Sequence, residues 1–213
     1  MTIIFLIIAF LISLSVHEMA HAYIGDKLGD PTARLMGRVT LNPLAHLDPV
    51  GTLLPIMLLI IGSPVVFGWG KPVRFDPYNL RNPKRDAAII SFAGPAANLL
   101  MAILFAIIIR VGLLTGALSP IVESLLVPFV VLNVTWGLFN LIPIHPLDGG
   151  KVLTGLLPDE PAREVDEFLS RYGTIILLFL ILPIFSSTSP LFIVLLPIVR
   201  AILSVLLPGV NLV

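Results

Sequence analysis

Long apolar runs are the feature that most constrains how this chain can fold. They lie at about residues 1–23, 49–67, 87–113, 120–142, 172–187 and 190–207. A helix needs roughly 20 apolar residues to cross the hydrocarbon core of a bilayer, and several of these runs approach that length. The sequence therefore predicts an all-α polytopic membrane protein with about five or six hydrophobic helices, a re-entrant or peripheral segment, and short extended loops.

Composition supports a membrane protein and excludes several kinds of chemistry. Hydrophobic residues make up 57% of the chain and charged residues 12%, which is about half of the roughly 25% that soluble proteins carry. The net charge is zero, so there is no case for nucleic acid as a partner. Cysteine is absent, which excludes disulfides and thiolate ligands and leaves nitrogen and oxygen ligands for a metal.

The chain shows no internal repeat and no stretch typical of an appended soluble domain. We therefore expect one membrane-embedded domain over residues 1–213, with a catalytic core at about 1–160 and C-terminal helices at about 171–207. The first apolar run lacks the basic flank and the small-residue cleavage site of a secretory signal, so we expect it to be retained.

Positive charge is concentrated in three polar stretches, at residues 25–48, 68–86 and 151–171. These stretches hold all but two of the 13 Lys and Arg residues, namely Lys27, Arg34, Arg38, Lys71, Arg74, Arg81, Lys84, Arg85, Lys151, Arg163 and Arg171. Short loops rich in Lys and Arg stay on the cytoplasmic side of a membrane. We therefore expect all three stretches to face the cytoplasm.

The apolar run at 49–67 lies between two of these stretches. If both face the cytoplasm, the run enters the membrane and returns without crossing it. Its prolines and glycines permit a broken or re-entrant helix, which is tolerated only where protein or a watery cavity covers the backbone. An ordinary spanning helix is the alternative that length alone allows.

The motif HEMAH places three ionisable groups, His17, Glu18 and His21, at the end of the first apolar run. Histidines at i and i+4 lie on one face of a helix, so both imidazoles can reach one Zn²⁺. Glu18 projects beside that position, where it can take a proton from the attacking water. A patch of hydrogen-bonded side chains is the alternative, but ionisable groups inside a membrane are costly and indicate function.

A catalytic zinc takes three protein ligands, so a third must come from elsewhere in the chain. The candidates are His46, Asp48, Glu123, His145 and Asp148. Glu123 is expected on the far side of the membrane, and His46 and Asp48 lie in a polar turn that we expect to fix a loop or line the entrance. His145 and Asp148 remain. For either to meet HEMAH, an even number of crossings must separate them from it, and the runs at 87–113 and 120–142 supply two, so a third crossing at 49–67 is not expected.

Three segments, in this order, resemble the site-2 protease family of intramembrane metalloproteases. They are HEMAH on the first helix, SFAGPAAN at residues 91–98 and NLIPIHPLDGG at residues 140–150. Within the second segment, Gly94, Pro95 and Asn98 match the family's G-P-x-x-N element. The order of all three motifs is far more specific than H-E-x-x-H alone.

The resemblance assigns roles to individual residues. It implies that Asp148, in the L-D-G motif, is the third zinc ligand. His145, three residues earlier, is a rival ligand from the sequence alone, and we favour Asp148 and expect His145 beside the ligands or at the water entrance. It implies that Asn140 holds the substrate backbone or the oxyanion. Asn98 is expected either to contact substrate or to hydrogen-bond one helix to another.

The resemblance therefore implies an intramembrane zinc metalloendopeptidase with one Zn²⁺ per chain. Its partners would be transmembrane protein substrates, cut in or near their membrane-spanning segments close to the cytoplasmic leaflet. We expect a multi-pass protein of a prokaryotic cell membrane, with its active site towards the cytoplasm. The segment at 68–76 is either an edge that adds an unwound substrate as a strand or an ordinary loop.

Two other functions fit the same composition. A non-proteolytic protein could bind transmembrane segments in the same pocket, although it would have no need of the base Glu18. A metal transporter would string polar residues through several helices, whereas this sequence gathers them at one depth.

Overall fold

The computed structural model describes residues 2–61, 68–183 and 189–208. Within these ranges the chain is helical, with two short 3-10 turns and one isolated antiparallel bridge between Leu47 and Gly70. The α-helices are α1 (Thr2–Leu28), α2 (Thr32–Leu35), α3 (Pro49–Ile60), α4 (Pro83–Thr115), α5 (Pro120–Asn140), α6 (Asp148–Leu156), α7 (Asp159–Ile181) and α8 (Pro190–Leu206). The predicted all-α class is confirmed.

Three of the described helices are long and apolar enough to cross a membrane. They are Ile4–Leu28 within α1, the whole of α4 and the whole of α5. The sequence predicted five or six hydrophobic helices, so this count is smaller. The apolar helix α8 has only 17 residues, and α7 carries charged residues through its first half.

The run at 49–67 is only partly described. Its helix α3 has 12 residues, fewer than the roughly 20 that a spanning helix needs. Residues 62–67 lie outside the described ranges. The re-entrant course of this run therefore stays a prediction.

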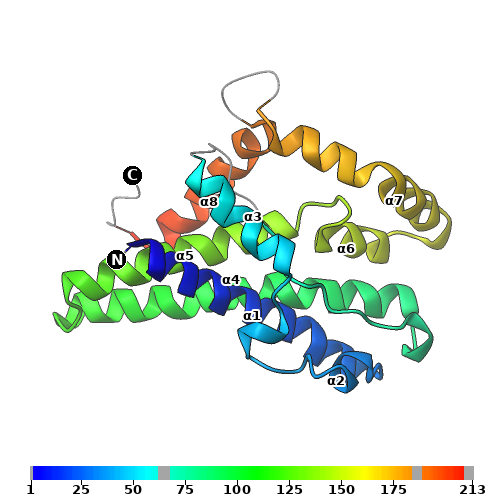
Figure 1. The fold of residues 1–213 in the computed structure, drawn as a ribbon, viewed down its shortest axis with the longest axis horizontal. Coiled ribbons are helices and arrows are strands. Elements are labelled where there is room, and N and C mark those ends of the chain that lie inside the picture. Colours follow the sequence, from blue (N-terminus) through cyan, green and yellow to red (C-terminus); the bar gives the residue numbers. More distant parts are fainter. Residues whose placement is uncertain (1, 62–67, 184–188, 209–213) are drawn as a thin grey trace.

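Helices α1, α4 and α5 run alongside one another and form the body of the molecule (Figure 1). Helices α4 and α5 are joined by a short turn, so they form an antiparallel hairpin that leads away from the HEMAH end of α1 and back towards that end. Alanines allow close helix packing, and the core between α4, α5 and α8 contains Ala102, Ala106, Ile109, Val130, Val134, Leu195, Val199 and Leu203.

Helix α6 packs directly against the first half of α4. A Cβ placed on Gly155 would lie 2.2 Å from the Cβ of Ala88, so the two helix backbones meet at this glycine. This contact fixes the direction of α6. It brings Asp148, the first residue of α6, over the end of α1 that carries HEMAH.

The segment after residue 67 is tied to the end of α1 by the buried carboxylate of Asp30. Its Oδ1 accepts hydrogen bonds from the Thr32 N–H, the Thr32 hydroxyl and the Asn79 amide, and its Oδ2 accepts one from the Asp76 N–H. Burial raises the pKa of Asp30, but these hydrogen bonds outweigh it and hold the pKa below its ordinary value. The segment therefore follows a fixed path past the HEMAH motif.

Candidate metal centre

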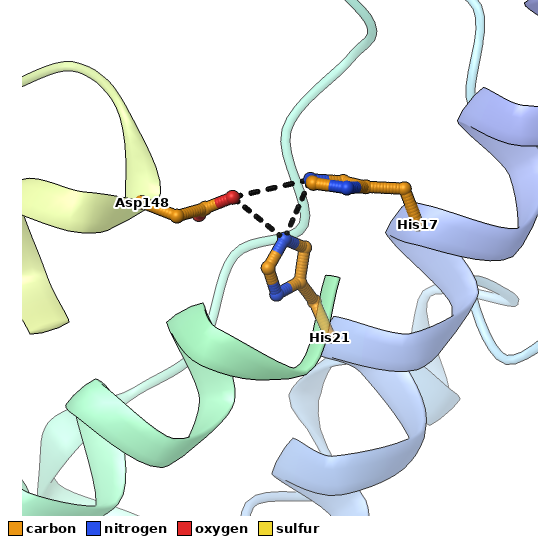
Figure 2. A group of neighbouring side chains, drawn as sticks. All are labelled: His17, His21 and Asp148. Carbon is orange, nitrogen blue, oxygen red and sulfur yellow. Dashed lines mark hydrogen bonds and ion pairs between the residues drawn. The ribbon is translucent and has the colours of Figure 1, made fainter. Parts of the chain in front are cut away.

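The side chains of His17, His21 and Asp148 meet at one point (Figure 2). The Nε2 atoms of the two histidines are 3.0 Å apart. Asp148 Oδ2 lies 3.1 Å from His17 Nε2 and 3.3 Å from His21 Nε2. The α4–α5 hairpin lies between these residues in the chain, and it returns Asp148 to the histidines as the two-crossing argument predicted.

Hydrogen bonds on the far side of each ring fix the form of both histidines. His17 Nδ1 donates to the Asn98 side-chain oxygen at 2.6 Å, and His21 Nδ1 donates to the Ile90 carbonyl at 2.7 Å. Both partners are acceptors, so the proton of each neutral ring sits on Nδ1. The unprotonated Nε2 atoms then point at each other and at Asp148.

Three electron-pair donors that converge in this way form a site that a cation can fill. Two imidazole nitrogens and one carboxylate oxygen form a donor set that Zn²⁺ prefers. With bonds of roughly 2 Å, a tetrahedral zinc sets its ligand atoms about 3.3 Å apart, which matches the observed separations of 3.0, 3.1 and 3.3 Å. The residues therefore fit the ion.

The carboxylate of Asp148 is partly buried and closes the third side of the cluster. Because both Nε2 atoms are unprotonated, the histidines offer this carboxylate neither a positive charge nor a hydrogen bond, so a cation held between the three groups would balance its charge. Asp148 is also the first residue of α6, and the positive end of a helix dipole favours a carboxylate there.

Gly94 of α4 makes room for the two imidazoles. A Cβ at this position would lie 2.4 Å from His21 Nε2 and 2.7 Å from His17 Cε1, well inside van der Waals contact. Only glycine lets α4 approach the histidines this closely. The G-P-x-x-N element therefore contributes a packing surface as well as the hydrogen bond from Asn98.

Asn98 connects the proposed ligand His17 to a chain of buried polar groups. Its amide nitrogen donates to the Ser13 carbonyl at 3.3 Å and to the Asn133 side-chain oxygen at 2.9 Å. The Asn133 amide in turn donates to the Ser13 hydroxyl and to the Phe129 carbonyl, both at 2.9 Å. These bonds fix which end of the Asn98 amide faces His17.

Sequence reasoning missed Asn133 and Ser13. Both are fully buried, and each is a polar residue inside an apolar run, which is the signal that could have found them. The sequence left Asn98 open between substrate contact and helix–helix bonding. The structure shows a hydrogen bond to His17 and bonds that join α1, α4 and α5.

Glu18 lies beside the cluster but outside it. Its side chain is buried, with 8% of the residue exposed, and its Oε2 accepts a hydrogen bond of 3.1 Å from the Val73 N–H. The carboxylate thus faces the segment at 68–76. This segment is not a strand in the described structure, apart from the single bridge at Gly70.

The other residues singled out from the sequence do not reach the cluster. Asn140 donates to the Trp136 carbonyl of its own helix at 3.1 Å. His145 pairs with Asp166 of α7 at 2.9 Å. His46 directly follows the 3-10 turn at Pro43–Ala45 and is buried. Its Nε2 donates to the Thr40 carbonyl at 2.8 Å, so it fixes a loop, which is one of the two roles that we expected for it.

The fold and the site define a class of protein, and comparison with known families agrees with it. Residues 5–119 and 111–180 match peptidase family M50. The chain therefore belongs to this family, the site-2 protease family that its motifs indicated, and it is a zinc metalloprotease.

Among curated proteins the chain is similar to YwhC of Bacillus subtilis, which carries the provisional name of a zinc metalloprotease. The two are 35% identical over 83% of this chain and 79% of YwhC. It is also similar to Rip2 of Mycolicibacterium smegmatis, named in the same provisional way, with 32% identity over 84% of this chain and 67% of Rip2. No solved structure matches the chain significantly.

Proposed function

We propose that this metalloprotease is an intramembrane endopeptidase that cuts transmembrane segments of other proteins near the cytoplasmic leaflet. His17, His21 and Asp148 hold the Zn²⁺, and Glu18 is the general base. The observation that carries the proposal is the meeting of three unprotonated donors from α1 and α6 beside a second carboxylate, that of Glu18. The two histidines and Glu18 lie on α1, which is long and apolar enough to cross a membrane, and this supports substrates that are themselves in the membrane.

When bound, Zn²⁺ supplies a Lewis acid that polarises the scissile carbonyl and makes water more acidic. Glu18 accepts a proton from the attacking water as the oxygen adds to the carbonyl carbon. It then delivers that proton to the leaving amine as the C–N bond breaks. Asn98 and the Ile90 carbonyl keep both imidazoles in the form that binds metal throughout.

Asn140 is the proposed donor to the oxyanion. It stands at the end of α5, just before the turn that leads to Asp148. Its amide bonds the Trp136 carbonyl one helical turn earlier, a carbonyl that the helix already satisfies. The amide can leave this bond for a substrate carbonyl at little cost.

The test is the substitution Glu18→Gln. Glutamine keeps the shape and the hydrogen bond from Val73 but cannot take a proton, so cleavage of a model transmembrane substrate should fall by about 10²-fold or more. Zinc content, measured by metal analysis of the purified protein, should stay at one per chain. Unchanged cleavage in the zinc-loaded variant would remove Glu18 from the mechanism.

A further inference from the structure

A charged cleft of about 730 Å³ opens beside the proposed catalytic residues. Its walls are residues 72–75, the first turns of α4, and parts of α6 and α7. Val73 lines the cleft and donates its N–H to Glu18. Lys151 lines it from α6, three residues after Asp148. An extended peptide that leaves the catalytic residues in this direction enters the cleft.

The cleft has an excess of positive charge. The charged residues that line it are the cations Arg74, Lys84, Lys151 and Arg163 and the carboxylates Asp159 and Asp166. Asp159 pairs with Lys84, and Asp166 accepts a hydrogen bond from His145, so two carboxylates face four cations.

Arg74, Lys151 and Arg163 make no salt bridge among the described residues, although the charges of Asp148 and Asp166 act on Lys151 from a longer distance. The ammonium of Lys151 lies 4.5 Å from the ring centre of Phe75, which holds it at the wall of the cleft. Beside these charges, Val73, Ala87 and Ala162 supply apolar surface. The cleft thus offers both contact area and unmatched positive charge.

We propose that this cleft binds the extramembrane flank of the substrate and selects flanks that carry carboxylates. The inference rests on the proposed function. Transmembrane proteins have an excess of Lys and Arg in their short cytoplasmic loops. The cleft therefore repels the common flanks that are rich in Lys and Arg, and it attracts the rarer flanks that carry carboxylates. Repulsion of wrong partners is an effective source of specificity, and it spares most membrane proteins from cleavage.

An anionic lipid headgroup is negatively charged like a flank that carries carboxylates, but the position of the cleft favours a peptide. One wall is the segment 72–75 that bonds Glu18, and another is α6, whose first residue is Asp148. A ligand in the cleft therefore lies on the path to the catalytic residues. A further wall of the cleft comes from the charged first half of α7.

The experiment uses the full chain, loaded with zinc in nanodiscs of phosphatidylcholine. Three model transmembrane substrates differ only in their cytoplasmic flank, which carries Glu, Gln or Lys at the same positions. We expect kcat/KM to rise about fivefold for each Glu over Gln, the upper end for an exposed ion pair, and to fall for Lys. Raising the salt from about 0.05 M to about 0.5 M should reduce this preference.

The double variant Arg74→Glu/Arg163→Glu should reverse the preference, so that the Lys flank is cut best. Arg81→Glu is the matched control, because Arg81 is exposed in the same polar stretch but does not line the cleft. It should keep the wild-type preference. If the double variant does not fold, the wild-type substrate series alone still decides the proposal.

The outcomes separate this inference from the proposed function. Equal kcat/KM for the three substrates, all dependent on Glu18, would overturn the cleft proposal and leave the endopeptidase standing. Failure of wild type to cut any of them would overturn both. If activity instead rises on adding phosphatidylglycerol, equally for every flank, the cleft is a headgroup site and the peptide proposal is wrong.

Discussion

At the scale of single residues, the metal centre depends on groups that do not touch the metal. Asn98 and the Ile90 carbonyl set the protonation of the two imidazoles, and Gly94 gives them space. Such partners commonly affect metal affinity by about 10–100-fold. Substitutions at Gly94 and at Asn133, the partner of Asn98, test the space around the imidazoles and their hydrogen bonding separately.

Gly94→Ala should weaken zinc binding. The added Cβ would lie 2.4 Å from His21 Nε2, so either the imidazole or α4 must move, and we expect at least about a tenfold loss of zinc affinity. Competition with a chromogenic chelator measures this. Gly112→Ala on the same helix is the control, because its Cβ would crowd Leu118 at 2.9 Å far from the site. An equal loss in both variants would mean that general destabilisation, not contact with the ligand, is responsible.

Asn133→Leu should weaken zinc binding as well, although Asn133 lies outside the donor cluster. It removes the acceptor that holds the Asn98 amide and the amide that donates to the Ser13 hydroxyl, which keeps its own bond to the Ala9 carbonyl. We expect a smaller loss of affinity than in Asn98→Leu, which removes the bond to His17 itself. In ¹⁵N NMR spectra of the His17 ring, a smaller fraction of the molecules should carry the ring proton on Nδ1. An unchanged ring spectrum would make Asn133 a packing residue only.

The sequence was informative about residues where one short motif carries the chemistry. HEMAH places two of the donors and the proposed base, and the L-D-G motif of the family points to Asp148. It could not reveal that Asn133 and Ser13 meet Asn98, because those contacts depend on the rotation of α1, α4 and α5 about their axes. It also could not exclude His145, whose partner Asp166 lies on a helix with no motif.

At the scale of elements, a change from polar to apolar residues suggested a boundary where the structure has one continuous helix. The sequence divided this region into a polar stretch at 151–171 and an apolar run at 172–187, but α7 spans Asp159–Ile181 without a break. No proline occurs after the first turn of this helix, so nothing in the chain ends it where its side chains change from charged to apolar.

Asp30 holds two elements together, so its ionisation should stabilise the fold. Asp30→Asn replaces one carboxylate oxygen by an NH₂ group, so either the Asp76 N–H or the Thr32 N–H loses its acceptor. We expect the free energy of unfolding at pH 7 to fall by about 1–3 kcal/mol. Because the folded pKa of Asp30 is below its ordinary value, this stabilisation is complete above about pH 4 and is lost as the pH falls through the folded pKa.

Thermal unfolding in detergent, followed by circular dichroism, measures this effect. The gap between the unfolding temperatures of wild type and Asp30→Asn should be widest at neutral pH and should narrow below about pH 4. A gap that is the same at both pH values would show that the carboxylate charge contributes nothing. A gap that widens in acid would contradict the sign.

At the scale of the whole molecule, the sidedness of the loops can be tested with cysteine labels, since the chain has no cysteine of its own. Met36, Tyr78 and Leu114 are all more than half exposed. Met36→Cys, Tyr78→Cys and Glu160→Cys should react with an impermeant maleimide from the cytoplasmic face. Leu114→Cys, at the other end of α4, should react only from the opposite face.

Labelling of Met36→Cys and Glu160→Cys from opposite faces would overturn this arrangement. The same assay decides the course of the run at 49–67, where Pro64 lies outside the described residues. Pro64→Cys should react from the same face as Met36→Cys if the run is re-entrant. Reaction from the other face would make it a spanning helix.

The proposed zinc ligands come from opposite ends of the catalytic core, two from α1 and one from the start of α6. Translation delivers the N-terminal pair to the translocon long before Asp148 has left the ribosome. If these three residues hold the ion, a half-made chain carries only two of its ligands, and zinc-dependent hydrolysis begins only after α6 has been made.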